Sequence, residues 1–328
     1  MPARSIRRRW RQRGVAVITA LLLTTLAVAI VASLFWQQQV QVRSMENQRL
    51  HLQTKWILRG ALDYTSLILD TFRGGYTSLD QAWALPVAET RLDQYIERER
   101  VAGENFDATL SGNVTDASAR YNLRNLASAN GPVQEQVALF SNLLRILQMQ
   151  QSLADRVAEY VAATLPPVAV PAEGAPTPTQ RRSTVNGKPI SLLQVDDLLA
   201  VPGVTQEMIE RLRPFVIVLP SGNTLTKVNV NTAPPELLAA LVSNMSVSEA
   251  NTLVAQRKQA PWKDMANFQL ALGNRTVIGG DTAAVTSEWF LVDSRIRLDR
   301  AALDAQSLIY RPSMPVAGGT RVMWTREN

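Results

Sequence analysis

The chain has 328 residues, of which 46% are hydrophobic and 19% are charged, and its 34 Lys and Arg residues outnumber 28 Asp and Glu residues. It has no cysteine and a single histidine, His51, which excludes disulfide frameworks, cysteine zinc sites, cysteine nucleophiles and two-histidine metalloprotease motifs. The formal net charge of +6 would normally indicate nucleic acid or an anionic membrane as a partner.

The first predicted element, residues 1–14, is a basic leader. It contains six arginines and no acidic residue, so the rest of the chain has 28 basic and 28 acidic residues and is formally neutral. The positive charge therefore belongs to the leader and does not indicate a nucleic-acid-binding domain.

Residues 15–36 form an apolar segment, and no charge follows it until Arg43. A helix of this length spans about 33 Å, which is enough to cross a hydrocarbon core of about 30 Å. Because the arginines precede it, we expect the segment to span the inner membrane once, with the N-terminus in the cytoplasm and the rest of the chain on the opposite, periplasmic side.

Three interpretations of this segment remain open. It is an ordinary signal anchor, a secretory signal peptide cut near Ala27–Ala29, or the helix of a prepilin, from which a dedicated peptidase removes the leader after Gly14. The apolar run exceeds the roughly 7–15 residues of a signal-peptide core, which disfavours secretion. The third interpretation makes Val15 the first mature residue.

In the prepilin interpretation, Thr19 is the fifth mature residue. The segment then resembles the start of pilins, most of which have a glutamate at this position. Since a carboxylate at bilayer depth is costly unless it is paired, Thr19 suggests a subunit at an end of a filament. An ordinary membrane helix would lack this glutamate as well.

The helix is predicted to continue, as an amphipathic segment, over residues 37–75. Ile57, Ala61, Tyr64, Ile68 and Phe72 recur at helical spacing and predict one face that packs on a sheet. Gly74 and Gly75 then end the helix.

The next segments mix strand and helix patterns. We expect a short helix over 86–100, a strand over 106–110, a turn at Ser111–Gly112, strand segments within 113–126 and a helix over 132–165. Pro166 and Pro167 end that helix, and an exposed Pro- and Ala-rich loop follows.

Two helix–turn–helix units come next. The first, residues 193–215, turns at Pro202–Gly203, and the second begins at residue 228 and turns over 243–246. Both resemble the helix-hairpin-helix fold of sterile-alpha-motif-like domains. Residues 288–298, 306–310 and 321–324 then predict strands, so a sheet domain is interrupted by a helical insertion.

A membrane-anchored DNA-binding protein, as in DNA uptake, is the alternative function. Against it, the second turn has no glycine to let backbone approach a phosphate. Residues 191–275 also contain seven basic and seven acidic residues, whereas DNA affinity depends on phosphate neutralisation. We therefore expect no nucleic acid as a partner. An enzyme is not expected either, because nucleophile-elbow, P-loop and metal-loop motifs are missing from the sequence.

Three motifs in this order resemble the minor pseudopilins of the general secretion pathway protein K family of type II secretion. They are the leader and helix start (residues 12–23), VTDASARYNLRNL (114–126) with Asn122 and Asn125, and VNVNTA (228–233) with Asn229, Asn231 and Thr232. The resemblance implies an α+β fold, in which a long pilin-like N-terminal helix packs on a small antiparallel sheet with a large helical domain inserted. The implied domains are the leader (1–14), the membrane span (15–36), its amphipathic continuation (37–75), the pseudopilin domain (76–126 and 281–328) and the inserted helical domain (127–280).

The resemblance also implies a structural role. Such a protein caps the periplasmic pseudopilus, joins minor pseudopilins I and J in a tip complex, and is processed by the prepilin peptidase, with minor pseudopilin H and the major pseudopilin as further partners. The family's calcium loop is acidic, but this chain retains only Glu159 and Glu173 there, and calcium prefers six to eight oxygen ligands. We therefore expect neither a metal nor another cofactor.

Overall fold

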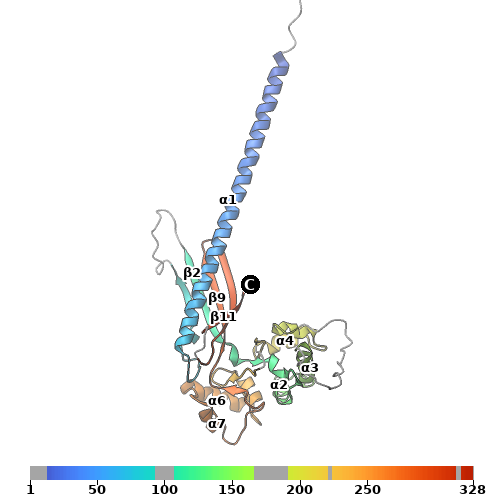
Figure 1. The fold of residues 1–328 in the computed structure, drawn as a ribbon, viewed down its shortest axis with the longest axis vertical. Coiled ribbons are helices and arrows are strands. Elements are labelled where there is room, and N and C mark those ends of the chain that lie inside the picture. Colours follow the sequence, from blue (N-terminus) through green and yellow to red (C-terminus); the bar gives the residue numbers. More distant parts are fainter. Residues whose placement is uncertain (1–12, 93–106, 166–190, 221–223, 315–318, 328) are drawn as a thin grey trace, which may run out of the picture.

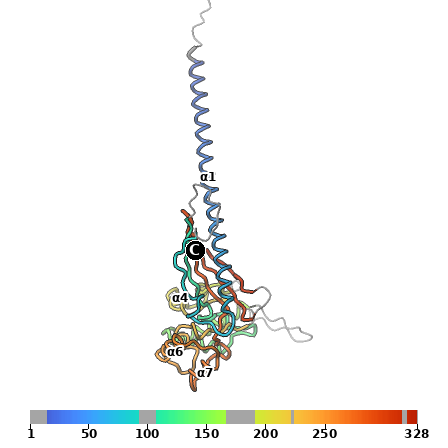
Figure 2. The backbone as a smooth tube through the Cα atoms, turned by 90° about the vertical axis from the view of Figure 1, so that its left-hand side faces the viewer, coloured from blue at the N-terminus to red at the C-terminus, as the bar shows by residue number. Residues whose placement is uncertain are grey.

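The computed structural model describes residues 13–92, 107–165, 191–220, 224–314 and 319–327. One helix, α1 (Arg13–Thr71), runs through 59 residues without a break. Its N-terminal half projects from the body, and every side chain described from Val15 to Arg49 is exposed (Figures 1 and 2). The apolar part of this helix is long enough to cross a membrane.

The second half of α1 lies on a five-stranded antiparallel sheet of order β1-β2-β9-β10-β11. The strands are β1 (Val87–Arg91), β2 (Ala108–Asp116), β9 (Trp289–Leu298), β10 (Ala301–Tyr310) and β11 (Arg321–Glu327). The long central strands pair in continuous register from Ala108↔Leu298 to Asp116↔Phe290 and from Ala301↔Leu298 to Tyr310↔Trp289. The predicted fold class, a long helix on a small antiparallel sheet with further helices, is confirmed.

Leu58, Leu62 and Leu69 of α1 are buried against the sheet. The predicted face is confirmed at Ile57, Ile68 and Phe72, which are partly buried against the same cluster, and is wrong at Tyr64, which is 64% exposed. The helix also has apolar side chains on its outer side in this region, so spacing alone could not exclude Tyr64 from the packed face. Two exposed ion pairs also join α1 to the sheet, Glu46 with Arg300 at 2.8 Å and Lys55 with Glu327 at 3.0 Å.

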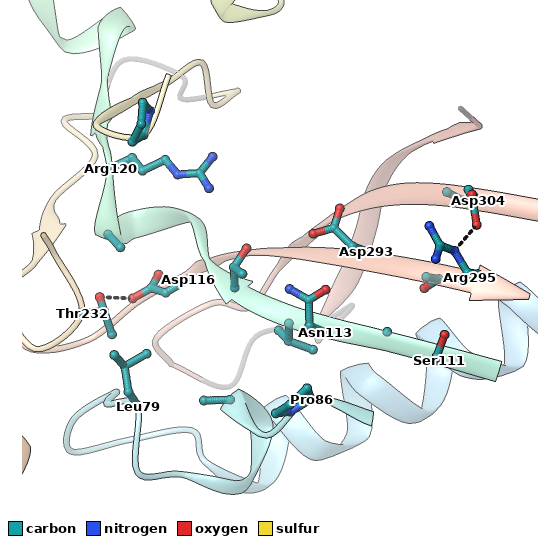
Figure 3. A pocket seen from close by; sticks show the side chains of 18 of the residues that line it. Leu79, Pro86, Ser111, Asn113, Asp116, Arg120, Thr232, Asp293, Arg295 and Asp304 are labelled. Carbon is teal, nitrogen blue, oxygen red and sulfur yellow. Dashed lines mark hydrogen bonds and ion pairs between the residues drawn. The ribbon is translucent and has the colours of Figure 1, made fainter. Parts of the chain in front are cut away.

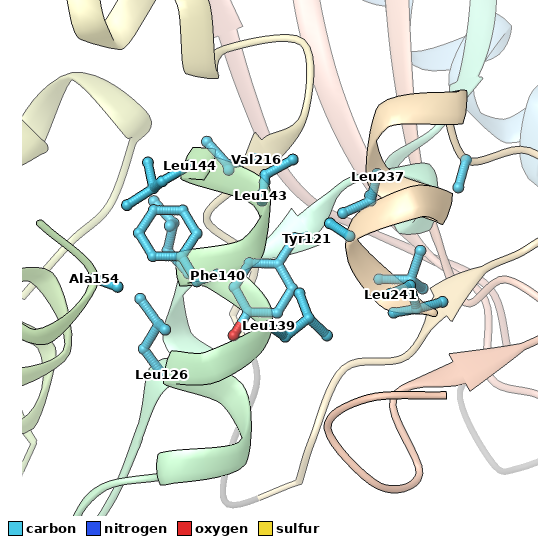
Figure 4. Close-up of a cluster of buried hydrophobic side chains, with 14 of the residues drawn as sticks. Tyr121, Leu126, Leu139, Phe140, Leu143, Leu144, Ala154, Val216, Leu237 and Leu241 are labelled. Carbon is cyan, nitrogen blue, oxygen red and sulfur yellow. The ribbon is translucent and has the colours of Figure 1, made fainter. Parts of the chain in front are cut away.

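The helices between β2 and β9 form a separate unit with its own core. Tyr121, Phe140 and Leu237 lie at its centre, and Figure 4 shows this cluster. Its α-helices are α2 (Gln134–Ile146), α3 (Leu153–Thr164), α4 (Gln206–Leu212), α5 (Pro235–Leu241), α6 (Val247–Gln259) and α7 (Met265–Leu272).

Short elements connect these helices. They are the 3₁₀ helices η1 (Ala82–Ala84), η2 (Ala117–Ala119), η3 (Leu123–Leu126) and η4 (Val195–Ala200), and the two-residue strands β3 (Tyr121–Asn122), β4 (Ala127–Ser128), β5 (Gly131–Pro132), β6 (Val216–Ile217), β7 (Val228–Asn229) and β8 (Ala283–Ala284).

Three local predictions are wrong. The segment predicted as a helix over 86–100 contains β1 in its described part, and residues 93–100 lie outside the described residues. The predicted turn at Ser111–Gly112 lies inside β2, where a Cβ at Gly112 would collide with the backbone oxygen of Asp293. That glycine permits close strand approach and makes no turn.

The single helix predicted over 132–165 is two helices, α2 and α3. Gln148 between them has φ of 56°, a left-handed conformation that cannot continue a right-handed helix. The apolar spacing on either side gave no sign of this break.

Candidate functional site: a buried polar joint

Asp116, the last residue of β2, lies where α1, the sheet and the helical unit meet. Its carboxylate accepts hydrogen bonds from the Ser287 hydroxyl at 2.5 Å, the Thr232 hydroxyl at 2.5 Å and the Asn229 amide at 3.0 Å. The backbone N–H of Ser118 donates a fourth, at 2.8 Å. Figure 3 shows the bond to Thr232. One carboxylate thus joins the sheet to residues of the helical unit.

Burial raises the pKa of Asp116 above its ordinary value, and the hydrogen bonds from Ser287, Thr232, Asn229 and Ser118 oppose this shift. Desolvation disfavours the charged form of a carboxyl, whereas donors stabilise it. The donors are therefore what makes a carboxylate tolerable at this depth.

Arg311 follows β10 and is 3% exposed. Its guanidinium donates to the carbonyl oxygens of Leu69 and Phe72, at 2.9 and 3.1 Å, at the C-terminal end of α1. Such terminal carbonyls have no partner within the helix and carry the negative end of its dipole. Burial lowers the pKa of Arg311 to about 10, so the side chain stays charged at neutral pH.

Thr77 and Ser287 connect the arginine to the carboxylate. Arg311 also donates to the Thr77 hydroxyl and the Ser287 carbonyl, both at 2.8 Å. The amide of Asn229 donates to the Thr77 carbonyl at 3.0 Å. The continuous network of Arg311, Thr77, Ser287, Asn229 and Asp116, called here the polar joint, links the end of the long helix to the helical unit.

The VNVNTA motif contributes two of its predicted residues directly to this joint, Asn229 and Thr232. Asn231 acts elsewhere: its side chain accepts from the Trp262 N–H at 3.0 Å and donates to the Trp262 carbonyl at 2.9 Å. It therefore pairs with backbone as a neighbouring strand would, and holds the segment between α6 and α7.

Asn122 and Asn125 lie outside the joint. Like Asn231, they hydrogen-bond to backbone groups, in the other half of the helical unit. Asn125 accepts from the Thr226 N–H at 3.0 Å and donates to the Thr226 carbonyl at 2.7 Å. Asn122 accepts from the Leu219 N–H at 3.1 Å. The side chains of these asparagines thus hydrogen-bond to backbone N–H and C=O groups in irregular segments, where no neighbouring strand pairs with them. Buried backbone polar groups are satisfied in this way.

Pro202 and Gly203 form the first hairpin turn, away from the joint. Gly203 has φ of +87° and the Val204 N–H donates to the Val201 carbonyl at 3.1 Å, as in a turn with Pro second and Gly third. The Arg156 guanidinium lies 3.1 Å from where a Cβ of Gly203 would be. In the second turn Asn244, with φ of 50°, takes the place of glycine.

Gly14, Val15 and Thr19 lie in the first turns of α1, at the far end of the molecule from the joint. The Thr19 hydroxyl donates to the carbonyl oxygens of Val15 and Ala16, both at 3.0 Å. The polar atom is thus satisfied within its own helix and needs no neighbour, whereas a glutamate there would need one.

The expected loss of the calcium site concerns residues that are only partly described. Glu159 lies in α3, but Glu173 and the loop around it lie outside the described residues. Within the described ranges, no group of three or more His, Asp or Glu side chains is placed to hold a metal ion.

Sequence reasoning missed Asp116, Thr77, Ser287 and Arg311. Asp116 lies within the VTDASARYNLRNL motif, so the resemblance covered its position, but nothing in the motif indicated that its carboxylate would be buried and hydrogen-bonded. Arg311 gave no signal, because a charged residue after a strand normally indicates a surface loop.

Two family models match the chain, both described as type II secretion system protein K: one over residues 228–287 and a first-domain model over 119–221. The type II secretion system protein K of Pseudomonas aeruginosa is 30% identical over 310 residues, covering 88% of this chain and 85% of its own. That of Pectobacterium carotovorum is 27% identical, covering 92% and 93%.

A similar solved structure is a chain in the crystal structure of the GspK–GspI–GspJ complex of the enterotoxigenic Escherichia coli type 2 secretion system. The TM-score is 0.63 at 20% identity, and the match covers 87% of this chain and 99% of that one. At this identity the likeness shows the fold.

Proposed function

Because the chain belongs to the type II secretion system protein K family, and is therefore a minor pseudopilin and not an enzyme, we propose that it caps the tip of the periplasmic pseudopilus. There it helps to start assembly of the filament for export of folded proteins across the outer membrane. Minor pseudopilins I and J are its partners in the tip, in keeping with the complex named for the similar structure.

The observation that carries this proposal is the position of the helical unit. It lies at the end of the sheet opposite to the projecting half of α1 (Figures 1 and 2). A pilin-like subunit within a shaft would have another subunit beyond that end. Here the space is filled by the protein's own helices, which suits the last subunit of a filament, as does Thr19.

The anchoring of the subunit follows from its leader and apolar helix. The arginines keep the N-terminus in the cytoplasm, α1 crosses the inner membrane once, and the body lies in the periplasm. Cleavage after Gly14 by the prepilin peptidase then leaves Val15 as the first residue.

We expect N-terminal sequencing of protein purified from membranes to begin at Val15. A Gly14→Val variant, in which the small residue at the cut is lost, should retain Met1. An intact Met1 in the wild-type protein would instead indicate an ordinary anchor, and a start near Ile30 would indicate a secreted protein.

The face of α1 that points away from the sheet supplies an assembly surface. Leu52, Trp56, Tyr64 and Leu67 lie along it and are 59–69% exposed. Gly60 lies among them, and apart from its chain neighbours and the backbone of its own helix no atom is within 4 Å of the place where its Cβ would be. A small residue between large apolar ones lets a second helix approach closely. This outer stripe continues the membrane helix toward the body.

A double variant, Trp56→Glu with Leu67→Glu, should reduce co-purification with minor pseudopilins I and J from membranes at least about tenfold, because two charges would be desolvated at the helix contact. The matched control is Leu270→Glu on α7, where the leucine is 80% exposed. If the partners were recovered equally with the control and with the double variant, the outer stripe would not be part of the assembly surface.

A further inference from the structure

A groove of about 1040 Å³ lies beside β2, between the sheet and the helical unit. This volume is at the upper end of the range for small-molecule sites. Leu79, Pro86, Pro214 and Pro234 contribute apolar walls, and polar groups of β2 and β9 line its floor. Figure 3 shows Pro86 and Leu79 on one side of β2 and Arg120 on the other.

The strand that lines the groove has a free edge. β1 pairs with β2 only between Thr109 and Gly112, with an irregularity in register, while β9 pairs with β2 as far as Asp116. Pro86 precedes β1 and has no N–H to extend the pairing. Among the described strands, residues 113–116 therefore have a neighbour on one side only. An unpaired edge of this kind is a template for a further strand.

Arg120 supplies a positive charge at the same groove. Burial lowers its pKa, and Asp293 and Asp116 oppose this shift by longer-range attraction. Among the described residues, its guanidinium makes neither a hydrogen bond nor an ion pair, and in Figure 3 it extends over the groove in the direction of Asp293. A guanidinium that has lost much of its water favours a carboxylate partner.

The other charged groups that line the groove are already engaged. Asp116 holds four donors in the polar joint. Asp293 accepts from Gln306 at 2.8 Å, and Arg295 pairs with Asp304 at 2.9 Å. Of the two arginines that line the groove, Arg120 is thus the one without an ion-paired carboxylate among the described residues, and it is the cation available to an acidic ligand.

We propose that this groove binds an extended segment of a partner protein that carries an Asp or Glu side chain. The segment adds to the free edge of β2 over residues 113–116, as in strand-addition recognition. Its carboxylate pairs with Arg120, and an apolar side chain contacts Leu79 and Pro86. The proposal does not depend on a tip position for the subunit.

The test measures binding of fluorescein-labelled peptides to the full chain in detergent micelles by anisotropy. The probes are TVTEVT, its glutamine counterpart TVTQVT, and TVTEVT with N-methylated backbone, which cannot pair as a strand. We expect the glutamate peptide to bind about tenfold more tightly than the glutamine peptide, and the methylated peptide to bind far more weakly than either.

Arg120→Gln should reduce the affinity for TVTEVT to that for TVTQVT, and leave the thermal unfolding of the protein unchanged. The matched control is Arg145→Gln, which removes an exposed arginine of α2 remote from the groove and should leave all affinities as in the wild type. Equal affinities for the two peptides, unimpaired binding of the methylated peptide, or no binding of TVTEVT at about 1 mM would each overturn the proposal.

Discussion

Asp116→Ala is expected to lower the free energy of unfolding by about 3 kcal/mol. The substitution removes an acceptor from four buried donors, those of Ser118, Asn229, Thr232 and Ser287. The Asn229 amide and the Thr232 hydroxyl retain other acceptors, the Thr77 and Asn229 carbonyls, so the Ser118 N–H and the Ser287 hydroxyl are the two donors left unpaired among the described residues. Each buried donor left unpaired costs about 1–3 kcal/mol, and the removal of a buried charge offsets part of the sum. Urea unfolding of the full chain in detergent, followed by circular dichroism, measures the effect.

Asp293→Ala is the matched control, because Asp293 is a half-buried acid of the same sheet whose side chain accepts from Gln306 alone among the described residues. It should cost less than about 1 kcal/mol. Asn229→Ala combined with Asp116→Ala should cost less than the two separate losses together, because both act on one network. Additive losses, or equal losses for Asp116→Ala and Asp293→Ala, would contradict a central role for Asp116.

The same carboxyl gives this prediction a characteristic pH dependence. Since burial raises the pKa of Asp116, the folded protein binds its proton more tightly than the unfolded chain does. The stability that this adds is complete below the unfolded pKa of about 3.9 and is lost as the pH rises through the higher folded pKa. Relative to Asp116→Asn, which does not titrate, the wild-type protein should therefore lose stability as the pH rises through this window.

The fold was predictable where a pattern is long and one-sided. The apolar run from Val15 to Trp36 and the alternating strands of the C-terminal segment follow from composition and spacing. The two helix–turn–helix units also resembled a known fold. The face of α1 was predictable only in part: Ile57, Ile68 and Phe72 of the predicted stripe pack on the sheet, whereas Tyr64 lies on the outer side with Trp56, which offers a second apolar stripe. Tertiary contact decides between them.

The polar joint was predictable only in part, for a different reason. Asn229 and Thr232 stood out because they belong to a motif that resembled the family. Their partners Thr77, Asp116 and Arg311 are far from them in sequence, and a buried charged residue has no local signature. Only the approach of the end of α1 to the end of β10 makes an arginine at that position a partner of helix carbonyls.

The groove beside β2 likewise could not be predicted from the sequence. Its edge exists because β1 is short, and the segment of β1 was predicted to be helical. Arg120 looked like any surface arginine in a motif. A free strand edge and a desolvated guanidinium become a candidate binding site only when the chain topology places both beside the same cavity.

Arg311→Met is expected to lower the free energy of unfolding by about 3 kcal/mol and to loosen the end of α1 in particular. Methionine retains the apolar stem over Phe290, whose ring centre lies 4.7 Å from the guanidinium carbon. It donates nothing to the carbonyls of Leu69, Phe72 and Ser287, which then lose the arginine as a donor in a buried or partly buried position. Hydrogen exchange of the last turns of α1, with urea unfolding, measures both effects.

Arg311→Lys separates charge from geometry in this prediction. Lysine keeps a positive charge near the negative end of the helix dipole, worth up to about 2 kcal/mol in a partly buried site, but it lacks the planar fork that reaches four acceptors from two sides. An intermediate loss is expected, and Arg321→Met, which removes an arginine stacked on Tyr310 at the sheet edge, should be nearly neutral. If Arg311→Lys were as stable as the wild type, charge alone would hold the helix end. If Arg311→Met left exchange at the end of α1 unchanged, the arginine would not couple the long helix to the rest of the polar joint, and the helical unit would be held in place by apolar packing instead.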